Sequence, residues 1–341
     1  MKALILEQPF RLIMHEAPAP RILSTGWALV KPIAVSICGS DYHSYRGENA
    51  LLSYPRILGH EVCGRVVSIQ GGSGFSEGDK VVLMPYLSCG NCKPCRKGKT
   101  NCCDHLSVYG VHRDGALADY FVAPADHLVK IEEKVDASLA ALVEPLSIST
   151  HAVERSGARE GDDVLVLGAG PIGTGAALMA GHVKKAHVAL ADPDPNRRAF
   201  VTKEFGLSDV FDPNASDYEE RVRKWSHGQL ADIVIDSTGN NLSMAQGLNM
   251  LCHGGRMVWV GISSKAISLD GTAFHVRETE LFDSRAAFPS DFEEVISAIE
   301  SGLVNPCGMI THQATFAESE EAFRKWEQLR GKVFKAIVKM E

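Results

Sequence analysis

A hydrophobic run followed by spaced glycines, near the middle of the chain, constrains the fold more than any other feature. Residues 164–173 read VLVLGAGPIG, so an apolar strand passes through a G-x-G-x-x-G turn into an alanine-rich segment. Gly168 permits the tight turn, Gly170 lets the backbone approach a pyrophosphate, and Gly173 lets helix and strand pack closely. This context predicts a dinucleotide-binding βαβ unit with a phosphate site at the helix N-terminus. The predicted cofactor residues of the turn are Gly168, Gly170, Pro171, Ile172 and Gly173.

The next predicted strand ends in a carboxylate, which favours NAD over NADP. Asp192 closes the run HVALAD, 19 residues after Gly173. A spacing of about 20 is expected for the residue that binds the adenosine ribose hydroxyls. A carboxylate there would repel a 2′-phosphate. Two alternatives stay open: Asp192 is a helix N-cap, or Arg197 and Arg198 pair with a phosphate instead.

The pattern of predicted secondary structure changes at about residue 163, which indicates two domains. Residues 2–129 show short β-like runs separated by turn residues, as in a β-rich barrel or sandwich. From about residue 163, strands alternate with helices, as in βαβ units on a parallel sheet. A length of 341 residues also usually divides into two domains. The sequence therefore predicts an α/β protein that joins a β-rich domain to a doubly wound parallel sheet.

Charge and hydropathy argue against two classes of partner, nucleic acids and membranes. The chain has 35 Lys and Arg against 42 Asp and Glu, a net charge of −7, and no long basic run, which argues against nucleic-acid binding. The uncharged stretch at residues 164–183 has the length of a membrane span, but its glycines belong to the dinucleotide turn. The apolar run Ala3–Leu6 is too short for a signal peptide. We therefore expect a cytoplasmic protein that binds small molecules.

Nine cysteines are present, and five of them fall within 15 residues. An odd number in a chain without an export signal argues against a disulfide framework and favours a metal site. Four follow the pattern C-x2-C-x2-C-x7-C, whose thiolates close a tetrahedron around zinc and leave no position for substrate. Cys103 is the expected fourth ligand, with its neighbour Cys102 as the alternative. The predicted structural zinc ligands are Cys89, Cys92, Cys95 and Cys103.

Three short motifs outside that cluster carry further metal-binding residue types. Residues 38–43 read CGSDYH, residues 59–61 read GHE, and residues 144–146 read EPL. Each motif alone also has an ordinary structural interpretation. Cys38 would be a small buried residue, His60 a turn histidine and Glu144 an acid at a helix start. Their order along the chain is more informative than any one of them.

Taken in order, CGSDYH, GHE, the cysteine cluster, EPL and VLGAGPIG make the chain resemble the zinc-dependent medium-chain dehydrogenase/reductase family, in its sorbitol dehydrogenase-like branch. The resemblance covers essentially the whole chain. It implies a GroES-like catalytic domain at residues 1–148 and 286–341, with a zinc lobe at about 86–113. It implies a Rossmann NAD-binding domain at residues 149–285. It also implies two zinc ions per chain, and a homodimer or homotetramer.

The resemblance also implies a second, catalytic zinc with one position left open. Cys38 and His60 would hold it together with Glu61 or Glu144, and the residues do not decide between the two glutamates. This zinc would lower the pKa of a substrate hydroxyl while the nicotinamide accepts a hydride. Ser40 would start the exit of the proton and His43 would be the outer base, with a surface turn histidine as the alternative for His43.

Two later strands are expected to line the cofactor path. The resemblance places Thr238, Val260 and Gly261 beside the cofactor, with an ordinary glycine turn as the alternative. Trp259 is expected on an edge of the sheet, which would indicate pairing across a homodimer. Burial of that edge by another element of the same chain is the competing explanation.

The wording of several segments resembles bacterial L-galactonate or L-gulonate 5-dehydrogenases, which implies oxidation of the C5 hydroxyl of a hexonate. These segments read SYPRILGHE, TNCC, VYGVH and DSR. A sugar acid needs a cation for its carboxylate, ideally the planar fork of arginine. Arg285 is the first candidate, ahead of His112 and Arg56, and a domain-interface salt bridge is its alternative role. The rival functions are a neutral polyol dehydrogenase and, from another class, a non-catalytic zinc- and nucleotide-binding regulatory protein.

Overall fold

In the computed structural model, which describes residues 1–22, 24–71, 74–329 and 331–340, contacts divide the chain into two units. Unit 1 comprises Met1–Glu144, Phe288–Glu300 and Met309–Glu341, and unit 2 comprises Pro145–Ala287 and Ser301–Gly308. Residues 301–308 thus lie with unit 2, although the sequence places them in the β-rich domain. The reason is close packing, because a Cβ added at Gly308 would lie 3.1 Å from Cβ of Glu204 in helix α6 (Pro195–Phe205).

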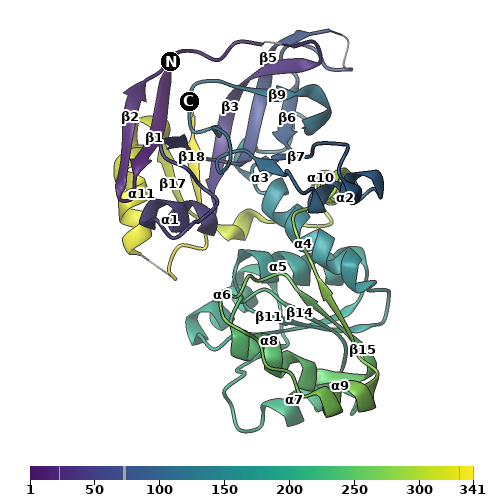
Figure 1. The fold of residues 1–341 in the computed structure, drawn as a ribbon. Coiled ribbons are helices and arrows are strands. Elements are labelled where there is room, and N and C mark those ends of the chain that lie inside the picture. The colour runs from purple at the N-terminus through teal and green to yellow at the C-terminus, as the bar shows by residue number, and fades with distance from the viewer. Residues whose placement is uncertain (23, 72–73, 330, 341) are drawn as a thin grey trace. The chain divides into compact units, whose positions relative to one another are not determined.

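Unit 1 contains a seven-stranded, a three-stranded and a two-stranded sheet (Figure 1). Its strands are β1 (Lys2–Gln8), β2 (Arg11–Glu16), β3 (Trp27–Ile37), β4 (Arg56–Ile57), β5 (Glu61–Gln70), β6 (Lys80–Leu83), β7 (Tyr86–Leu87), β8 (Ser107–Val108), β9 (Phe121–Pro124), β10 (Leu128–Lys130), β17 (Ile310–Thr315) and β18 (Lys335–Lys339). The largest sheet has the order β10-β6-β5-β3-β18-β17, and β9 also pairs with β3. The last strand, β18, therefore completes a sheet that the N-terminal part of the chain begins.

The long strand β3 carries the chain from the surface into the core of unit 1. In its first half buried residues alternate with more exposed ones, as in a strand with one solvated face, whereas residues 34–37 are all buried between β5 and β18. The strand therefore delivers the next residue, Cys38, to the interior. The helices associated with this unit are α1 (Gly39–Arg46), α2 (Lys93–Arg96), α3 (Ala137–Ala140), α10 (Pro289–Glu300) and α11 (Ser319–Gln328), with α4 (Val143–Ser156) starting in unit 1 and continuing in unit 2.

Unit 2 is a six-stranded parallel sheet in the order β13-β12-β11-β14-β15-β16, which confirms the predicted doubly wound fold. Its strands are β11 (Asp163–Leu167), β12 (His187–Ala191), β13 (Val210–Phe211), β14 (Ala231–Asp236), β15 (Leu251–Trp259) and β16 (Glu280–Asp283). Its helices include α5 (Pro171–Leu178), α6, α7 (Tyr218–Trp225), α8 (Asn241–Gly247) and α9 (Gly271–Arg277). Helices α5 and α6 lie on one side of the sheet, and α7, α8 and α9 on the other (Figure 1).

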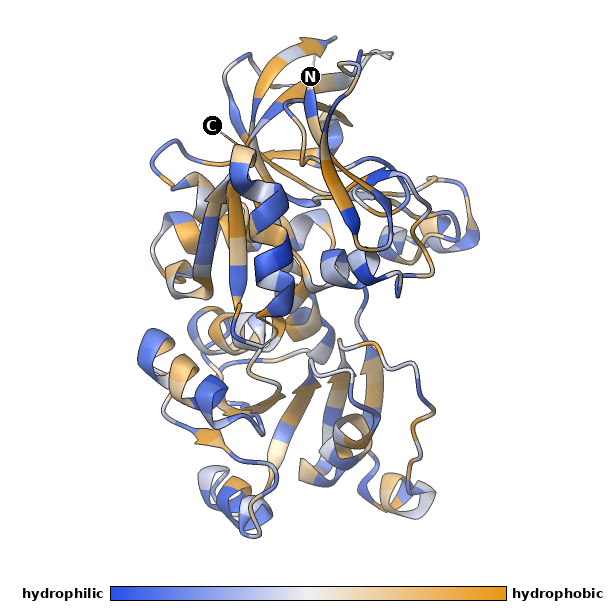
Figure 2. Ribbon diagram, turned by 90° about the vertical axis from the view of Figure 1, so that its left-hand side faces the viewer, coloured by the Kyte–Doolittle hydropathy of each residue, from blue (hydrophilic) through white to orange (hydrophobic). Residues whose placement is uncertain are grey.

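The strands of this sheet are apolar because both faces are covered. Four of the five residues of β11 and five of the six residues of β14 are buried. Figure 2 accordingly shows these strands mainly in the hydrophobic colour. Near-continuous apolar runs are typical of parallel strands packed between two layers of helices.

The expected position of Trp259 on a sheet edge is wrong. Strand β15 pairs with β14 on one side and with β16 on the other, where Trp259 lies opposite Asp283. The competing explanation, burial of that edge by another element of the same chain, is therefore confirmed. The homodimer or homotetramer stays a prediction that no longer rests on this residue.

The uncharged stretch at residues 164–183 is not one helix. It contains strand β11, the glycine turn, α5 and a π-helical turn at Met179–Val183. Among the residues that the structure describes, no helix has the length and apolar character needed to cross a bilayer.

Candidate metal centres and cofactor site

Two neighbouring strands of unit 1 bring together Cys38, His60 and Glu61. Strand β3 ends just before Cys38, and β5 begins at Glu61, which lies opposite Ser36 in the antiparallel pair. One ligand atom from each of the three residues lies within 4.8 Å of the others. His60 and Glu61 are buried, and Cys38 is partly buried. Residues from two distant motifs thus form one potential ligand set.

The donors of this set fit a zinc ion. Nδ1 of His60 is buried without a hydrogen-bond partner, and a carboxylate oxygen, Oδ1 of Asp41, lies 3.8 Å away from it. Burial alone lowers the pKa of His60, but the Asp41 carboxylate and the Cys38 thiol raise it above its usual range. Sulfur, nitrogen and carboxylate oxygen are the ligands that zinc takes in proteins, and three of them leave a position open.

The two glutamates near this set have different partners. Glu61 accepts hydrogen bonds on both carboxylate oxygens from Nζ of Lys335, a buried ion pair within unit 1. Burial would raise the pKa of Glu61, but the Lys335 ammonium and His60 lower it. Glu144, in the first turn of α4, accepts a hydrogen bond on Oε1 from the hydroxyl of Tyr86. Burial and the charge of Glu61 raise the pKa of Glu144 to about 7, against the opposing effect of His60.

The predicted proton-path residues lie on helix α1, directly after Cys38. Ser40 is partly buried and His43 is exposed, three residues further along the same helix face. Nδ1 of His43 lies 2.8 Å from a carboxylate oxygen of Glu48. Helix α1 itself is held by Asp41, which accepts a hydrogen bond from the backbone N–H of Cys38 at 2.9 Å. The helix therefore runs from the buried set to the surface.

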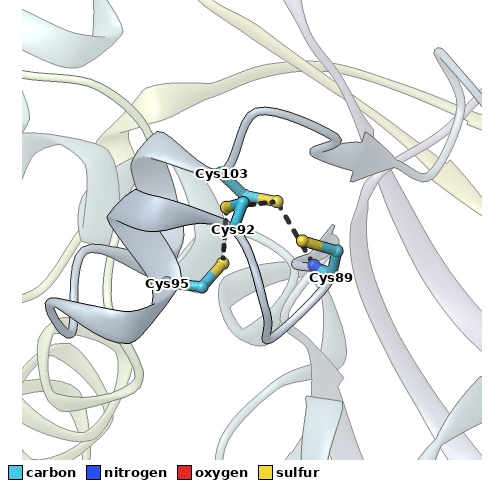
Figure 3. Close-up of side chains that lie close together, drawn as sticks. All are labelled: Cys89, Cys92, Cys95 and Cys103. Carbon is cyan, nitrogen blue, oxygen red and sulfur yellow. Dashed lines mark hydrogen bonds between the residues drawn. The ribbon is translucent and has the colours of Figure 1, made fainter.

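Four cysteines of the zinc lobe converge on one point (Figure 3). Their sulfurs lie within 4.8 Å of one another, with Cys92 3.3 Å from Cys95 and 3.8 Å from Cys103. Zinc–sulfur bonds of about 2.3 Å in a tetrahedron place sulfurs roughly 3.8 Å apart, so the group fits a closed zinc site. Backbone N–H groups of residues 91 and 92 lower the pKa of Cys89 to about 7, which favours the thiolate that zinc binds. Cys102 is exposed and outside this group.

The glycine turn of unit 2 has the close approaches that its sequence predicts. Gly168 has φ +102°, in the region that favours glycine. A Cβ added at Gly173 would lie 1.9 Å from the carbonyl oxygen of Gly168, so only glycine fits there. Gly170 is the N-cap of α5, whose first residues are Pro171 and Ile172. The free N–H groups of this helix start can face a phosphate.

Asp192 is held beside this turn. Its nearly buried carboxylate accepts hydrogen bonds from the backbone N–H groups of Ala169 at 2.7 Å and Asp194 at 2.8 Å. Nη1 of Arg197 lies 4.0 Å from it. Arg198 donates to the carbonyls of residues 192 and 193 and lies 3.1 Å from Asp212. The structure thus commits Arg198 to other acceptors and gives the turn a fixed negative charge.

Thr238, Val260 and Gly261 gather beyond the carboxyl ends of β14 and β15. The hydroxyl of Thr238 donates to Asp236 at 2.8 Å, and the backbone N–H of Val260 donates to the carbonyl of Asp236, also at 2.8 Å. A Cβ added at Gly261 would lie 2.1 Å from the nitrogen of Gly239. In open α/β sheets this edge is where ligands bind.

Comparison with known proteins agrees with both units. Residues 24–133 match the alcohol dehydrogenase GroES-like domain family, and residues 171–301 match the zinc-binding dehydrogenase family. L-galactonate-5-dehydrogenase of Escherichia coli is 38% identical over 326 residues, 95% of each chain. The chain belongs to the zinc-dependent medium-chain dehydrogenase family. It is therefore an enzyme that uses zinc and NAD. This finding excludes the alternative of a non-catalytic zinc- and nucleotide-binding regulatory protein.

Other relatives of this dehydrogenase differ in their named activities. A sorbitol dehydrogenase of Halalkalibacterium halodurans is 31% identical over 301 residues, 86% of each chain. An alcohol dehydrogenase of E. coli, solved with NADH, superposes with a TM-score of 0.90 at 32% identity and covers 100% of this chain and 99% of its own.

The three predicted substrate residues of the dehydrogenase do not form one group in either unit. Arg56, on β4, lies 3.3 Å from Asp114 and donates to the hydroxyl of Ser53 at 3.0 Å. His112 is exposed, and its Nδ1 accepts the backbone N–H of Val108 at 3.2 Å. Arg285 belongs to unit 2, two residues after β16. Arg56 in particular is already engaged by a carboxylate.

The sequence predictions lack Lys335 and Tyr86, which lie near Cys38, His60, Glu61 and Glu144. Lys335 opens the apolar run KAIV of β18, where a lysine at a buried position is a signal that a partner carboxylate exists. Tyr86 sits in an unremarkable strand, and nothing in its local sequence marks it. Both approach the site from segments distant in the chain.

Proposed function

We propose that this dehydrogenase oxidises a secondary hydroxyl of a sugar acid, a hexonate such as L-gulonate or L-galactonate at C5, with NAD+ as acceptor. The observation that carries the proposal is the group of partly buried Cys38 with buried His60 and Glu61, whose mixed donors suit an open, catalytic zinc. The 38% identity to an L-galactonate-5-dehydrogenase supports the substrate class. A neutral polyol such as sorbitol or xylitol is the second candidate, favoured by the identity to a sorbitol dehydrogenase.

In this proposal Cys38 and His60 hold the catalytic zinc together with a carboxylate. One carboxylate oxygen of Glu61 lies within 4.8 Å of a ligand atom of each of these two residues. Glu144 is the other candidate, and its Oε1 accepts a hydrogen bond from Tyr86. When bound, the zinc supplies Lewis acidity to the substrate hydroxyl and NAD+ accepts the hydride. The cysteines 89, 92, 95 and 103 hold the structural zinc.

The proton released by the substrate leaves along helix α1. Ser40 accepts it near the buried site and passes it to the exposed end of the path at His43. A carboxylate oxygen of Glu48 lies 2.8 Å from Nδ1 of His43 at this end of the path. This path keeps the proton away from the departing hydride and delivers it to water.

Asp192 is proposed to select NAD over NADP. Its carboxylate is held by two backbone N–H groups at the end of β12, so it cannot easily turn away from a 2′-phosphate. Arg197 remains near enough to contribute to phosphate binding. The cofactor residues beyond the sheet edge, Thr238, Val260 and Gly261, would contact the remainder of the dinucleotide.

The carboxylate of a hexonate needs a cation, and Arg285 is our first candidate. Arg56 ranks behind it because Asp114 already offsets its charge, and exposed His112 ranks with Arg56.

We also propose domain limits of 1–148 with 286–341 and of 149–285. A cytoplasmic location and a homodimer or homotetramer are further proposals.

Turnover of L-gulonate, L-galactonate, L-idonate, sorbitol and xylitol with NAD+ and with NADP+ tests the function. We expect the acids to be preferred, and NAD+ over NADP+. Strong turnover of sorbitol or xylitol with none of the acids would contradict the proposal. Arg285→Ala should lower kcat/KM for the acids and spare the polyols. Arg223→Ala, at an exposed position of helix α7 that is paired with Glu219, is the matched control.

A further inference from the structure

The two glutamates near Cys38 and His60, Glu61 and Glu144, are held by different kinds of partner. Glu61 has both oxygens engaged by the ammonium of Lys335, which offsets its negative charge. Glu144 is equally buried but meets a neutral phenol, which engages only Oε1. Because a phenol donates and a carboxylate accepts, this contact stabilises the ionised form of Glu144 without cancelling its charge.

Tyr86 is itself held firmly in unit 1. Strand β7 pairs with β8, and the backbone carbonyl of Tyr86 lies 3.2 Å from Nε2 of His127. The ring lies in a T-shaped arrangement with that of Phe292, a fully buried residue of α10, with 6.5 Å between ring centroids. A side chain fixed at backbone and ring can set the position of what its hydroxyl binds.

The charges around Glu144 explain why such an anchor is needed. The thiol of Cys38 and the carboxylate of Glu61 lie in the same buried cluster, and Lys335 is committed to Glu61. A catalytic zinc bound to Cys38 and His60 would then attract the Glu144 carboxylate. An extra carboxylate on that zinc would close the position that substrate needs.

We propose that Tyr86 is a positioning residue that restrains Glu144, so that the carboxylate stays beside the catalytic metal without closing its open position. This inference rests on the proposed function, with Cys38, His60 and Glu61 rather than Glu144 as the ligands of a catalytic zinc. The hydroxyl of Tyr86 holds Oε1, so a movement of Glu144 onto the metal would have to strain or break this hydrogen bond. Tyr86 thereby acts through Glu144 and does not touch the reacting atoms.

Cobalt substituted selectively for the catalytic zinc provides the decisive readout, because its d–d absorption bands report the ligand set. In Tyr86→Phe we expect weaker, shifted bands, as the coordination number rises when the freed Glu144 binds. We also expect a lower kcat. Tyr86→Met, which lacks the hydroxyl as well, should give the same bands and serves if the first variant folds poorly.

Two controls separate this role from a merely structural one. Tyr109 is a buried tyrosine of the same unit whose hydroxyl donates to the main-chain carbonyl of Val122 at 2.8 Å, so Tyr109→Phe should leave the bands unchanged. In a Glu144→Gln background, adding Tyr86→Phe should change the bands no further. Bands of Tyr86→Phe equal to those of the wild type, or an effect that persists in that background, would overturn the inference.

The wild-type spectrum distinguishes a failed inference from a failed function. If the unmodified protein shows no thiolate-to-cobalt absorption from a site that depends on Cys38, the proposed catalytic centre is wrong. If that absorption is present and the hydroxyl-free variants match the wild type, only the role of Tyr86 is wrong.

Discussion

The two metal centres of unit 1 differ in how far apart in the chain their ligands lie. The four cysteines of the lobe fall within one short loop segment, around the helical turns at Lys93–Arg96 and Thr100–Cys102. Cys38, His60 and Glu61 meet only because β3 and β5 pair, and Glu144 arrives from a third segment. A local site can therefore form with little help from the fold, whereas the dispersed site depends on the whole core.

The difference extends to what surrounds each centre. The lobe offers four sulfurs and backbone N–H groups, which makes a closed site. The dispersed site is surrounded by titratable side chains, namely buried Asp41, Glu144 and Lys335 and partly buried Tyr86. Groups of that kind shift pKa values and move protons, so they are expected where chemistry occurs. The comparison thus supports the proposal that catalysis takes place at the dispersed centre and that the lobe has a structural role.

Loss of a ligand from the dispersed centre should have the largest effect on activity. Outer-sphere partners of metal ligands typically contribute about 10–100-fold, so removing a ligand in Cys38→Ser should lower kcat/KM by at least about 100-fold. Zinc content should fall from two ions per chain to one. Metal analysis with steady-state kinetics measures both. A variant that keeps two zinc ions and most of its activity would place catalysis elsewhere.

Breaking the buried ion pair between Lys335 and Glu61 should have the largest effect on the free energy of unfolding. The side chains of Lys335 and Glu61 are 4% and 0% exposed, so Lys335→Met leaves a buried carboxylate without its cation. Such changes cost about 3–5 kcal/mol. Urea denaturation should show this loss, while Lys339→Met, an exposed position on the same strand, should change stability by less than about 0.5 kcal/mol. Equal effects in the two variants would mean that the pair is not stabilising the site.

Loss of a cysteine ligand from the lobe should affect local stability more than activity, unlike Cys38→Ser. Cys95→Ser removes one of four ligands from a closed site, so the lobe should lose its zinc and unfold locally. The catalytic zinc should remain. We expect faster proteolysis within residues 86–113 and largely retained turnover. Loss of turnover as complete as in Cys38→Ser would erase the distinction between the two centres.

The same contrast explains what could be predicted from the sequence. The lobe and the glycine turn are local, and each fixes its geometry through spacing that is visible in the chain, as the close approach of Gly173 to Gly168 illustrates. Lys335 and Tyr86 become relevant only through packing between distant strands, which no local pattern encodes. Trp259 was misplaced for a related reason: whether β15 or β16 forms the edge depends on a pairing that spacing does not reveal.

The smallest effect is expected at the cysteine that the lobe does not use. Cys102 and Cys103 are adjacent, so spacing alone leaves open which of them is the fourth ligand. Cys103 is buried and its sulfur accepts the backbone N–H groups of Cys89 at 3.2 Å and His105 at 3.3 Å, whereas Cys102 is exposed. Cys102→Ser should therefore keep two zinc ions and change stability by no more than about 0.5 kcal/mol, as surface substitutions do. Cys103→Ser, one residue away, should lose the zinc of the lobe. Metal analysis of the two variants measures this difference. If Cys102→Ser lost that zinc and Cys103→Ser kept it, Cys102 would be the fourth ligand.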